Sequence, residues 1–218
     1  MIERKRVAIL ISGRGSNMKA LIEAAQDPSY PAEIAIVLSN RPSAAGLTYA
    51  EGAGIATCVI DHKVHESRDS FDAAIDAKLH SMRIDLVALA GFMRIMTTDF
   101  VEAWRDRMIN IHPSLLPLYK GLHTHERALA DGVRLHGCTS HFVRHEVDTG
   151  PIIAQAAVPV IEGDTPDTLS ARVLAAEHQL YPHALRLVAS GQARVKDERV
   201  IIAGQSKAAG PLINPPLR

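Results

Sequence analysis

Short apolar runs alternate with helical spacing through the first half of the chain. The runs that predict buried strands lie at 7–11, 34–38, 57–60, 86–90 and 108–111. Between some of them, apolar residues recur every three or four positions, as at 18–25 and 71–82. Continuous apolar strands that alternate with helices indicate a parallel sheet covered on both faces. We therefore predict an α/β fold: a Rossmann-like, open, mostly parallel twisted sheet with helices on both sides.

The pattern changes after Pro113. Residues 137–143 and 152–160 predict two longer strands, and residues 166–190 predict one long helix. Pro182 lies inside that helix and is expected to bend it, because proline donates no backbone hydrogen bond.

The chain shows no repeat and no clear linker, so we expect a single domain over 1–203 with two halves, at about 1–105 and 106–203. Two short strands are expected near 193 and 200. Residues 204–218 are dominated by Gly, Pro and Ser, which predicts a loosely held tail.

Composition narrows the class of partner. The 218 residues carry 24 Lys and Arg against 24 Asp and Glu, whereas a protein that binds nucleic acid normally has a basic excess. Cys58 and Cys138 form no CxxC motif, so neither a disulfide framework nor a thiolate zinc site is indicated. No run of about 18 apolar residues could span a bilayer. We expect a cytoplasmic protein, a monomer or homodimer, that binds small molecules and neither nucleic acid nor membrane.

A glycine-rich loop at 13–17 leaves the first strand and opens the first helix. Glycines let the backbone approach a ligand, and the free amides at a helix start favour a phosphate. Met18 stands where a dinucleotide fingerprint needs its third glycine. Arg41 could nevertheless meet a 2′-phosphate, so an NADP-dependent reductase stays open as an alternative, as does an ordinary strand-to-helix turn.

Asn110 and His112 come at the carboxyl end of the fifth predicted strand, where open α/β sheets bind ligands. Residues two apart on a strand point the same way, so an amide and an imidazole would face one cavity. Such a pair can stabilise an oxyanion and move a proton. Asp148 could orient the imidazole and favour its cationic form. A structural histidine beside a proline turn is the alternative.

Glu177 lies at the edge of the buried stripe of the long helix. A carboxylate there needs a partner, either substrate hydroxyls or an amine, or a neighbouring arginine. The 11 histidines include His123, His125, His136 and His141, but no HExxH motif accompanies them, so we expect no metal site.

Five segments occur together in the order typical of one enzyme family. They are 12–17 (SGRGSN), 90–95 (AGFMRI), 110–117 (NIHPSLLP), 121–125 (GLHTH) and 148–151 (DTGP). From about residue 6 to residue 190 the chain resembles the phosphoribosylglycinamide formyltransferases.

That resemblance implies transfer of a formyl group from 10-formyltetrahydrofolate to the amino group of glycinamide ribonucleotide, in purine biosynthesis. The first half would bind the ribonucleotide, through Gly15, Ser16 and Asn17 at its phosphate, with Glu177 of the second half at its ribose. The residues matched to the folate site are Arg68, Met93, Arg94, Ile95, Met96 and Asn110. The matched catalytic residues are Asn110, His112 and Asp148.

Two related families share part of this pattern. Methionyl-tRNA formyltransferases carry a further C-terminal nucleic-acid-binding domain, and formyltetrahydrofolate deformylases carry an additional N-terminal domain. Here the first predicted strand begins near residue 7, and about two dozen residues follow the long helix. We therefore expect the ribonucleotide formyltransferase, with a deformylase-like hydrolase as the alternative.

Overall fold

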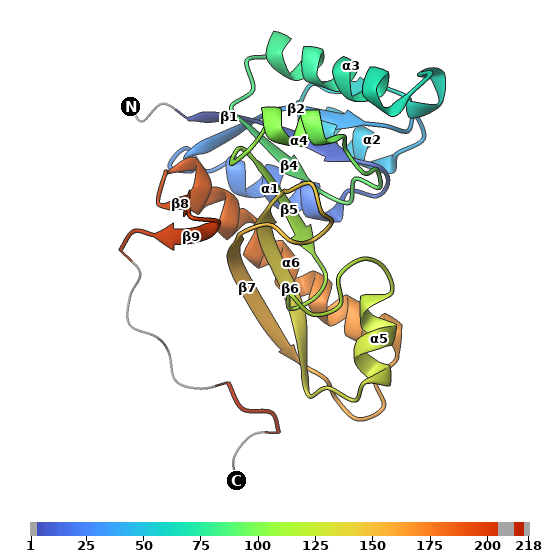
Figure 1. Cartoon of the computed structure of the whole chain (residues 1–218), viewed down its shortest axis with the longest axis vertical. Coiled ribbons are helices and arrows are strands. Elements are labelled where there is room, and N and C mark those ends of the chain that lie inside the picture. The colour runs from blue at the N-terminus through green and yellow to red at the C-terminus, as the bar shows by residue number, and fades with distance from the viewer. Residues whose placement is uncertain (1–3, 205–211, 216–218) are drawn as a thin grey trace.

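The computed structural model describes residues 4–204 and 212–215, and a single large sheet crosses the molecule (Figure 1). Its strand order is β3-β2-β1-β4-β5-β6-β7. The strands are β1 (Lys5–Ile11), β2 (Ala32–Ser39), β3 (Thr57–Val59), β4 (Leu86–Leu89), β5 (Met108–His112), β6 (Leu135–Phe142) and β7 (Ile152–Pro159). Strands β1 to β5 are mutually parallel, whereas β6 and β7 are antiparallel to their neighbours. The predicted mostly parallel α/β sheet is confirmed.

Helices cover both faces of this sheet. They are α1 (Ser16–Ala25), α2 (Ala45–Gly52), α3 (Arg68–Ser81), α4 (Thr98–Ala103), α5 (Thr124–Ala130) and α6 (Pro166–Ala189), with a short 3-10 helix η1 (His62–Val64). Alternate residues of β1 enter separate apolar clusters, because successive side chains of a strand point to opposite faces. Ile9 packs in the cluster that includes residues of α1 and α6, and Leu10 in the one that includes residues of α3. The sheet is therefore buried on both sides.

The long helix α6 begins where the sequence predicts it. Thr165 caps it and Pro166 occupies its first turn, while the neighbouring Asp164 pairs with Arg172 at 2.8 Å. Pro182 lies inside the helix, and its carbonyl accepts a hydrogen bond from the Tyr30 hydroxyl at 2.6 Å. The proline is thus accommodated within a helix that continues to Ala189.

The two short strands expected after α6 are confirmed as β8 (Ala193–Lys196) and β9 (Arg199–Ile202), which form a separate two-stranded sheet. Most of the tail expected at 204–218 lies outside the described residues. In its described part, Asn214 Nδ2 donates to the carbonyl of Arg134 at 2.6 Å.

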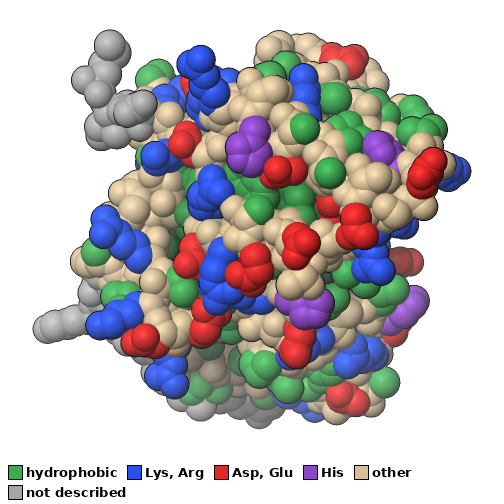
Figure 2. Space-filling view, turned by 45° about the horizontal axis from the view of Figure 1, so that its top comes forward, with side chains coloured by type: hydrophobic (Ala, Val, Ile, Leu, Met, Phe, Trp, Pro, Cys, Tyr) green, Lys and Arg blue, Asp and Glu red, His purple; other side chains and the backbone are tan. Residues whose placement is uncertain are grey.

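Charged side chains of both signs mix over the surface. On the face in Figure 2, Lys and Arg side chains are interspersed with Asp and Glu rather than gathered into one basic patch, as the equal numbers of the two classes would suggest. Along residues 4–204 and 212–215, no helix combines the length and apolar character needed to cross a membrane.

Candidate active site

A cavity of about 810 Å³ opens at the carboxyl ends of β4 and β5. Its walls come from the segments that follow these strands, from the loop after β6 and from residues of α1 and α6. From β1 the strands are added toward one edge as β2 and β3, and the chain then crosses back to add β4 and β5 on the other side of β1. The order of the strands therefore changes direction between β1 and β4. Parallel sheets bind ligands at such a reversal, because the loops after the flanking strands diverge there.

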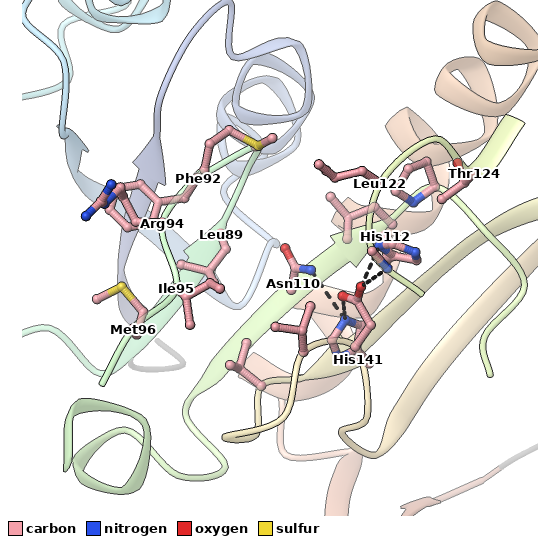
Figure 3. Close-up of a pocket in the computed structure, with 18 of the residues that line it drawn as sticks. Leu89, Phe92, Arg94, Ile95, Met96, Asn110, His112, Leu122, Thr124 and His141 are labelled. Carbon is pink, nitrogen blue, oxygen red and sulfur yellow. Dashed lines mark hydrogen bonds and ion pairs between the residues drawn. The ribbon is translucent and has the colours of Figure 1, made fainter. Parts of the chain in front are cut away.

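Asp148 lines this cavity and lies between two histidines, His112 and His141, which are labelled in Figure 3. Its Oδ2 is 3.3 Å from His112 Nδ1, and its Oδ1 is 3.7 Å from His141 Nε2. The backbone amide of Gly121 also donates to Oδ2, at 2.9 Å. All three side chains are nearly buried, at 7% exposure or less, so the carboxylate acts on the imidazoles with little screening by water.

His112 faces an acceptor at each ring nitrogen. Its Nε2 lies 2.9 Å from the carbonyl oxygen of Tyr119, and its Nδ1 faces Asp148. A carbonyl and a carboxylate both accept, so the surroundings suit an imidazolium that donates from both nitrogens. Sequence reasoning expected the imidazole of His112 to face the cavity but did not anticipate the Tyr119 carbonyl at its Nε2.

His141 lies beside Asn110 because the two residues are register partners across β5 and β6. Its Nδ1 bonds the carbonyl of Phe142 at 2.9 Å, which leaves Nε2 as the acceptor for Asn110 Nδ2 at 3.3 Å. Burial lowers the pKa of His141 and keeps it neutral. Sequence reasoning considered His141 only as a metal ligand, and the strand register was the signal that could have placed it beside Asn110.

Asn17 and Glu177 also line the cavity. Asn17 Nδ2 donates to Glu177 Oε2 at 2.6 Å, and Glu177 is 6% exposed. Burial raises the pKa of this carboxyl group. Within residues 4–204 no basic side chain forms an ion pair with it, so the expected alternative of a structural arginine partner is not what the fold provides.

The glycine-rich loop turns at Gly15, whose φ of +70° favours glycine. Gly15 is the N-cap of α1, and no side chain caps this helix end. Ser16 lines a neighbouring groove of about 520 Å³ between α1 and α6. Met18, at the position of the missing third glycine, is fully buried in the core, so the loop does not form the dinucleotide fingerprint.

The segment after β4 forms an apolar wall. Met93 and Ile95 are 59% and 60% exposed, and they line the cavity with Arg94 and Met96. Hydrogen bonds hold the segment at both ends, from Met93 N to Ser12 Oγ at 2.8 Å and from Thr97 N to Asp72 Oδ2 at 2.6 Å.

Leu122 and Val147 face the cavity from other segments, and they are 66% and 50% exposed. Exposed apolar side chains around one cavity indicate a ligand with an apolar body. The motif-based prediction did not include these two residues. Arg68, which it did include, is an exposed residue at the start of α3 that does not line the cavity.

Over residues 4–204 and 212–215, no group of three or more His, Cys, Asp or Glu side chains is placed to hold a metal ion. His125 and His136 instead pack ring to edge, with their centroids 5.4 Å apart. Burial lowers the pKa of His136 to about 4.

Comparison with known proteins places this arrangement in a family. The family model described as formyl transferase matches residues 5–185. The chain belongs to the formyl transferase family.

Relatives of this formyl transferase include a phosphoribosylglycinamide formyltransferase and a trifunctional purine biosynthetic protein. The phosphoribosylglycinamide formyltransferase of Escherichia coli is 42% identical over 199 residues, which cover 91% of this chain and 94% of the relative. The trifunctional purine biosynthetic protein adenosine-3 of Homo sapiens is 56% identical over 189 residues, 87% of this chain. The chain spans only 19% of that human protein's length.

A solved structure agrees with the fold. The glycinamide ribonucleotide transformylase 1 of Symbiobacterium toebii has a TM-score of 0.89 and 45% identity, over 91% of this chain and 94% of that one. Most of the site residues predicted for this formyl transferase line one cavity, while Gly15 and Ser16 belong to the adjoining loop and Arg68 lies elsewhere. Those that line it are Asn17, Met93, Arg94, Ile95, Met96, Asn110, His112, Asp148 and Glu177.

Proposed function

We propose that this formyl transferase moves the formyl group of 10-formyltetrahydrofolate to the amino group of N1-(5-phosphoribosyl)glycinamide. The products are formylglycinamide ribonucleotide and tetrahydrofolate. The observation that carries the proposal is one cavity lined by the His112 and Asp148 pair, by exposed apolar side chains and by the Asn17 and Glu177 pair. Two small molecules as partners and a cytoplasmic location belong to the same proposal.

The ribonucleotide would lie along the α1 side of the cavity. The uncapped amides at the start of α1 suit its phosphate, because they point at the ligand and the helix dipole favours an anion. Glu177 is buried with the Asn17 amide as its donor, so its free lone pairs can accept from the ribose hydroxyls. This orientation directs the substrate amine toward His112.

The folate would occupy the apolar end. Met93 and Ile95 face the cavity from one segment, and Leu122 and Val147 from two others, so a flat aromatic ring could be held between them. Each 100 Å² of apolar surface buried there would contribute about 2.5 kcal/mol before the costs of binding are subtracted.

In the proposed reaction, the substrate nitrogen attacks the formyl carbon directly. A C–N bond forms, the carbonyl π electrons move onto the oxygen, and collapse of that intermediate breaks the bond to the folate nitrogen. The Nε2 proton of His112 and an amide proton of Asn110 would stabilise the oxyanion, with the substrate oxygen replacing the Tyr119 carbonyl as acceptor. Asp148 would orient the ring of His112 through Nδ1, and the proton lost by the amine would reach the leaving nitrogen through the same groups or a water molecule.

The test is an absorbance assay of formyl-folate turnover, with the ribonucleotide either supplied or withheld. Turnover that depends on the ribonucleotide supports the transferase, whereas equal turnover in its absence identifies a deformylase-like hydrolase. Titration with NADPH, followed by its fluorescence, provides a further control. We expect no binding, because Met18 fills the position of the third glycine.

A further inference from the structure

The turn between β8 and β9 contains two residues in an unfavourable conformation. Lys196 pairs with Arg199, so Asp197 and Glu198 alone form the turn. Their φ values are +49° and +55°, as in a type I′ hairpin turn. Glycine is preferred at the second of these positions, because the left-handed conformation costs a residue with a side chain about 1–2 kcal/mol. A glutamate at this position therefore needs a compensating contact.

The carboxylate of Glu198 makes that contact with two arginines from distant parts of the chain. Its Oε2 accepts from Arg144 Nε at 2.7 Å, and its Oε1 accepts from Arg105 Nη2 at 2.5 Å. Arg144 also donates from Nη2 to Asp106 Oδ1 at 2.6 Å, and from Nη1 to the carbonyl oxygen of the preceding residue, Val143, at 3.0 Å. The Arg144 side chain is only 10% exposed, so its guanidinium is held in one place.

Arg144 is at the base of the loop that carries Asp148, residues 143–150. The loop closes tightly, since Phe142 N donates to the carbonyl of Pro151 at 2.9 Å. A Cβ on Gly150 would lie 1.7 Å from the Phe142 oxygen and 3.3 Å from Arg144 Cγ. The position of the Arg144 side chain and the path of the loop are therefore coupled.

We propose that Glu198 is a positioning residue for formyl transfer. By fixing Arg144, it holds the loop 143–150 so that the carboxylate of Asp148 stays against His112. The β8–β9 hairpin, 50 residues further along the chain than Asp148, thus becomes part of the support of the active site. The activity readout of this inference rests on the proposed function, while its structural readout does not.

Glu198→Gly separates positioning from stability. Glycine relieves the positive-φ strain at the turn, so the thermal midpoint should stay the same or rise. The loss of the carboxylate should nevertheless lower kcat by about three- to fivefold, the upper part of the range for a partly exposed ion pair. The KM for the ribonucleotide should not change, because the residues proposed to bind it, among them Asn17 and Glu177, take no part in these contacts.

Glu102→Gln is the matched control. Glu102 accepts from the same Arg105 at 2.9 Å and 3.1 Å, and it is half-exposed like Glu198. Among the described residues, Arg144 forms its ion pairs with Asp106 and Glu198 and not with Glu102. The control removes the same charge and should leave kcat within about twofold of the wild type. Glu198→Gln should reproduce the loss seen with Glu198→Gly, and combining it with Arg144→Gln should add nothing to the loss from Arg144→Gln alone.

Hydrogen exchange provides the readout that needs no substrate. The amides of 143–150 and the Gly121 amide, which bonds Asp148, should exchange faster in both Glu198 variants and not in Glu102→Gln. Wild-type kcat with wild-type exchange in Glu198→Gly and Glu198→Gln would overturn the proposal. A wild-type protein with no formyl transfer would instead contradict the proposed function, and the exchange experiment would still decide the role of Glu198.

Discussion

The two halves of the sheet bury different kinds of side chain. In β1 the buried positions are aliphatic from Val7 to Ile11, whereas β6 buries His136, Thr139, Ser140 and His141. Apolar side chains can pack on both faces of a strand without hydrogen-bond partners, but buried polar groups need such partners in the right place. The parallel half therefore supplies the packed core, and the antiparallel half supplies the constraints that aim the active-site residues.

Thr139 illustrates those constraints. Its hydroxyl donates to the carbonyl of Ser114 at 2.7 Å and accepts from the amide of Leu116 at 3.0 Å. Gln155 Nε2 also donates to it, at 2.9 Å. One buried hydroxyl on β6 thus fixes the turn that follows His112, and a hydrocarbon at that position could not do so.

The largest effect should come from the active-site residues that the polar half of the sheet helps to position. His112→Ala and Asp148→Asn should each reduce kcat by roughly 10²–10³-fold, about 3–4 kcal/mol of transition-state stabilisation, because each change disrupts the imidazolium that would meet the oxyanion. Ribonucleotide binding, measured by calorimetry, should remain. Near-wild-type turnover in either variant would remove that residue from the mechanism.

The parallel half should respond in stability rather than in turnover. Leu10→Ala, at a fully buried position, should lower the free energy of unfolding by about 3 kcal/mol through lost burial and the cavity left behind. The kcat per folded molecule should not change.

Leu212→Ala is the matched control, because Leu212 is 74% exposed and the change should cost less than about 0.5 kcal/mol. Urea unfolding measures both variants. A Leu10→Ala protein that unfolds like the wild type would contradict the division of the sheet into a core half and an active-site half.

The same difference explains what the sequence could predict. Buried apolar runs such as 86–90 identify the parallel strands directly, because a strand covered on both faces needs an apolar side chain at nearly every position. The short helices α2, α4 and α5 have too few turns to show a clear period, and they were not predicted.

The candidate site was predictable only in part. Motif matches named Asn110, His112 and Asp148, and the cavity brings them together. The pairing of His141 with Asn110 depends on the register of β5 and β6, and the Tyr119 carbonyl reaches His112 through a residue at φ +53°. Neither contact has a signature in residue type or spacing, because both arise from chain paths that tertiary packing decides.

The polar half of the sheet should also make stability depend on pH, through His136 on β6. We expect this effect on the free energy of unfolding to be of intermediate size. The pKa of His136 is lowered from 6.5 to about 4 by burial, so the unfolded chain takes up this proton first as the pH falls. The contribution of neutral His136 is fully present above pH 6.5 and is lost as the pH falls toward about 4. Between pH 6.5 and about 5 the free energy of unfolding should drop by about 2 kcal/mol.

His136→Phe should flatten that part of the stability curve, because phenylalanine fills a similar volume and binds no proton. His80→Phe is the control, since His80 lies exposed on α3 and should leave the curve unchanged. Identical curves for the wild type and His136→Phe would show that His136 does not couple folding to protonation.

The smallest effect on stability is expected for Glu177, a buried residue that lines the cavity. Burial raises the pKa of this carboxyl group, so its charged form opposes folding at neutral pH. Glu177→Gln keeps the shape and removes that charge, so the free energy of unfolding should rise. The KM for the ribonucleotide should rise by about tenfold, because an amide accepts fewer hydroxyl hydrogen bonds than a carboxylate. Higher stability together with weaker substrate binding would show that this buried charge is retained for the ligand. A variant that is less stable and binds normally would instead assign Glu177, with Asn17, to the support of the core.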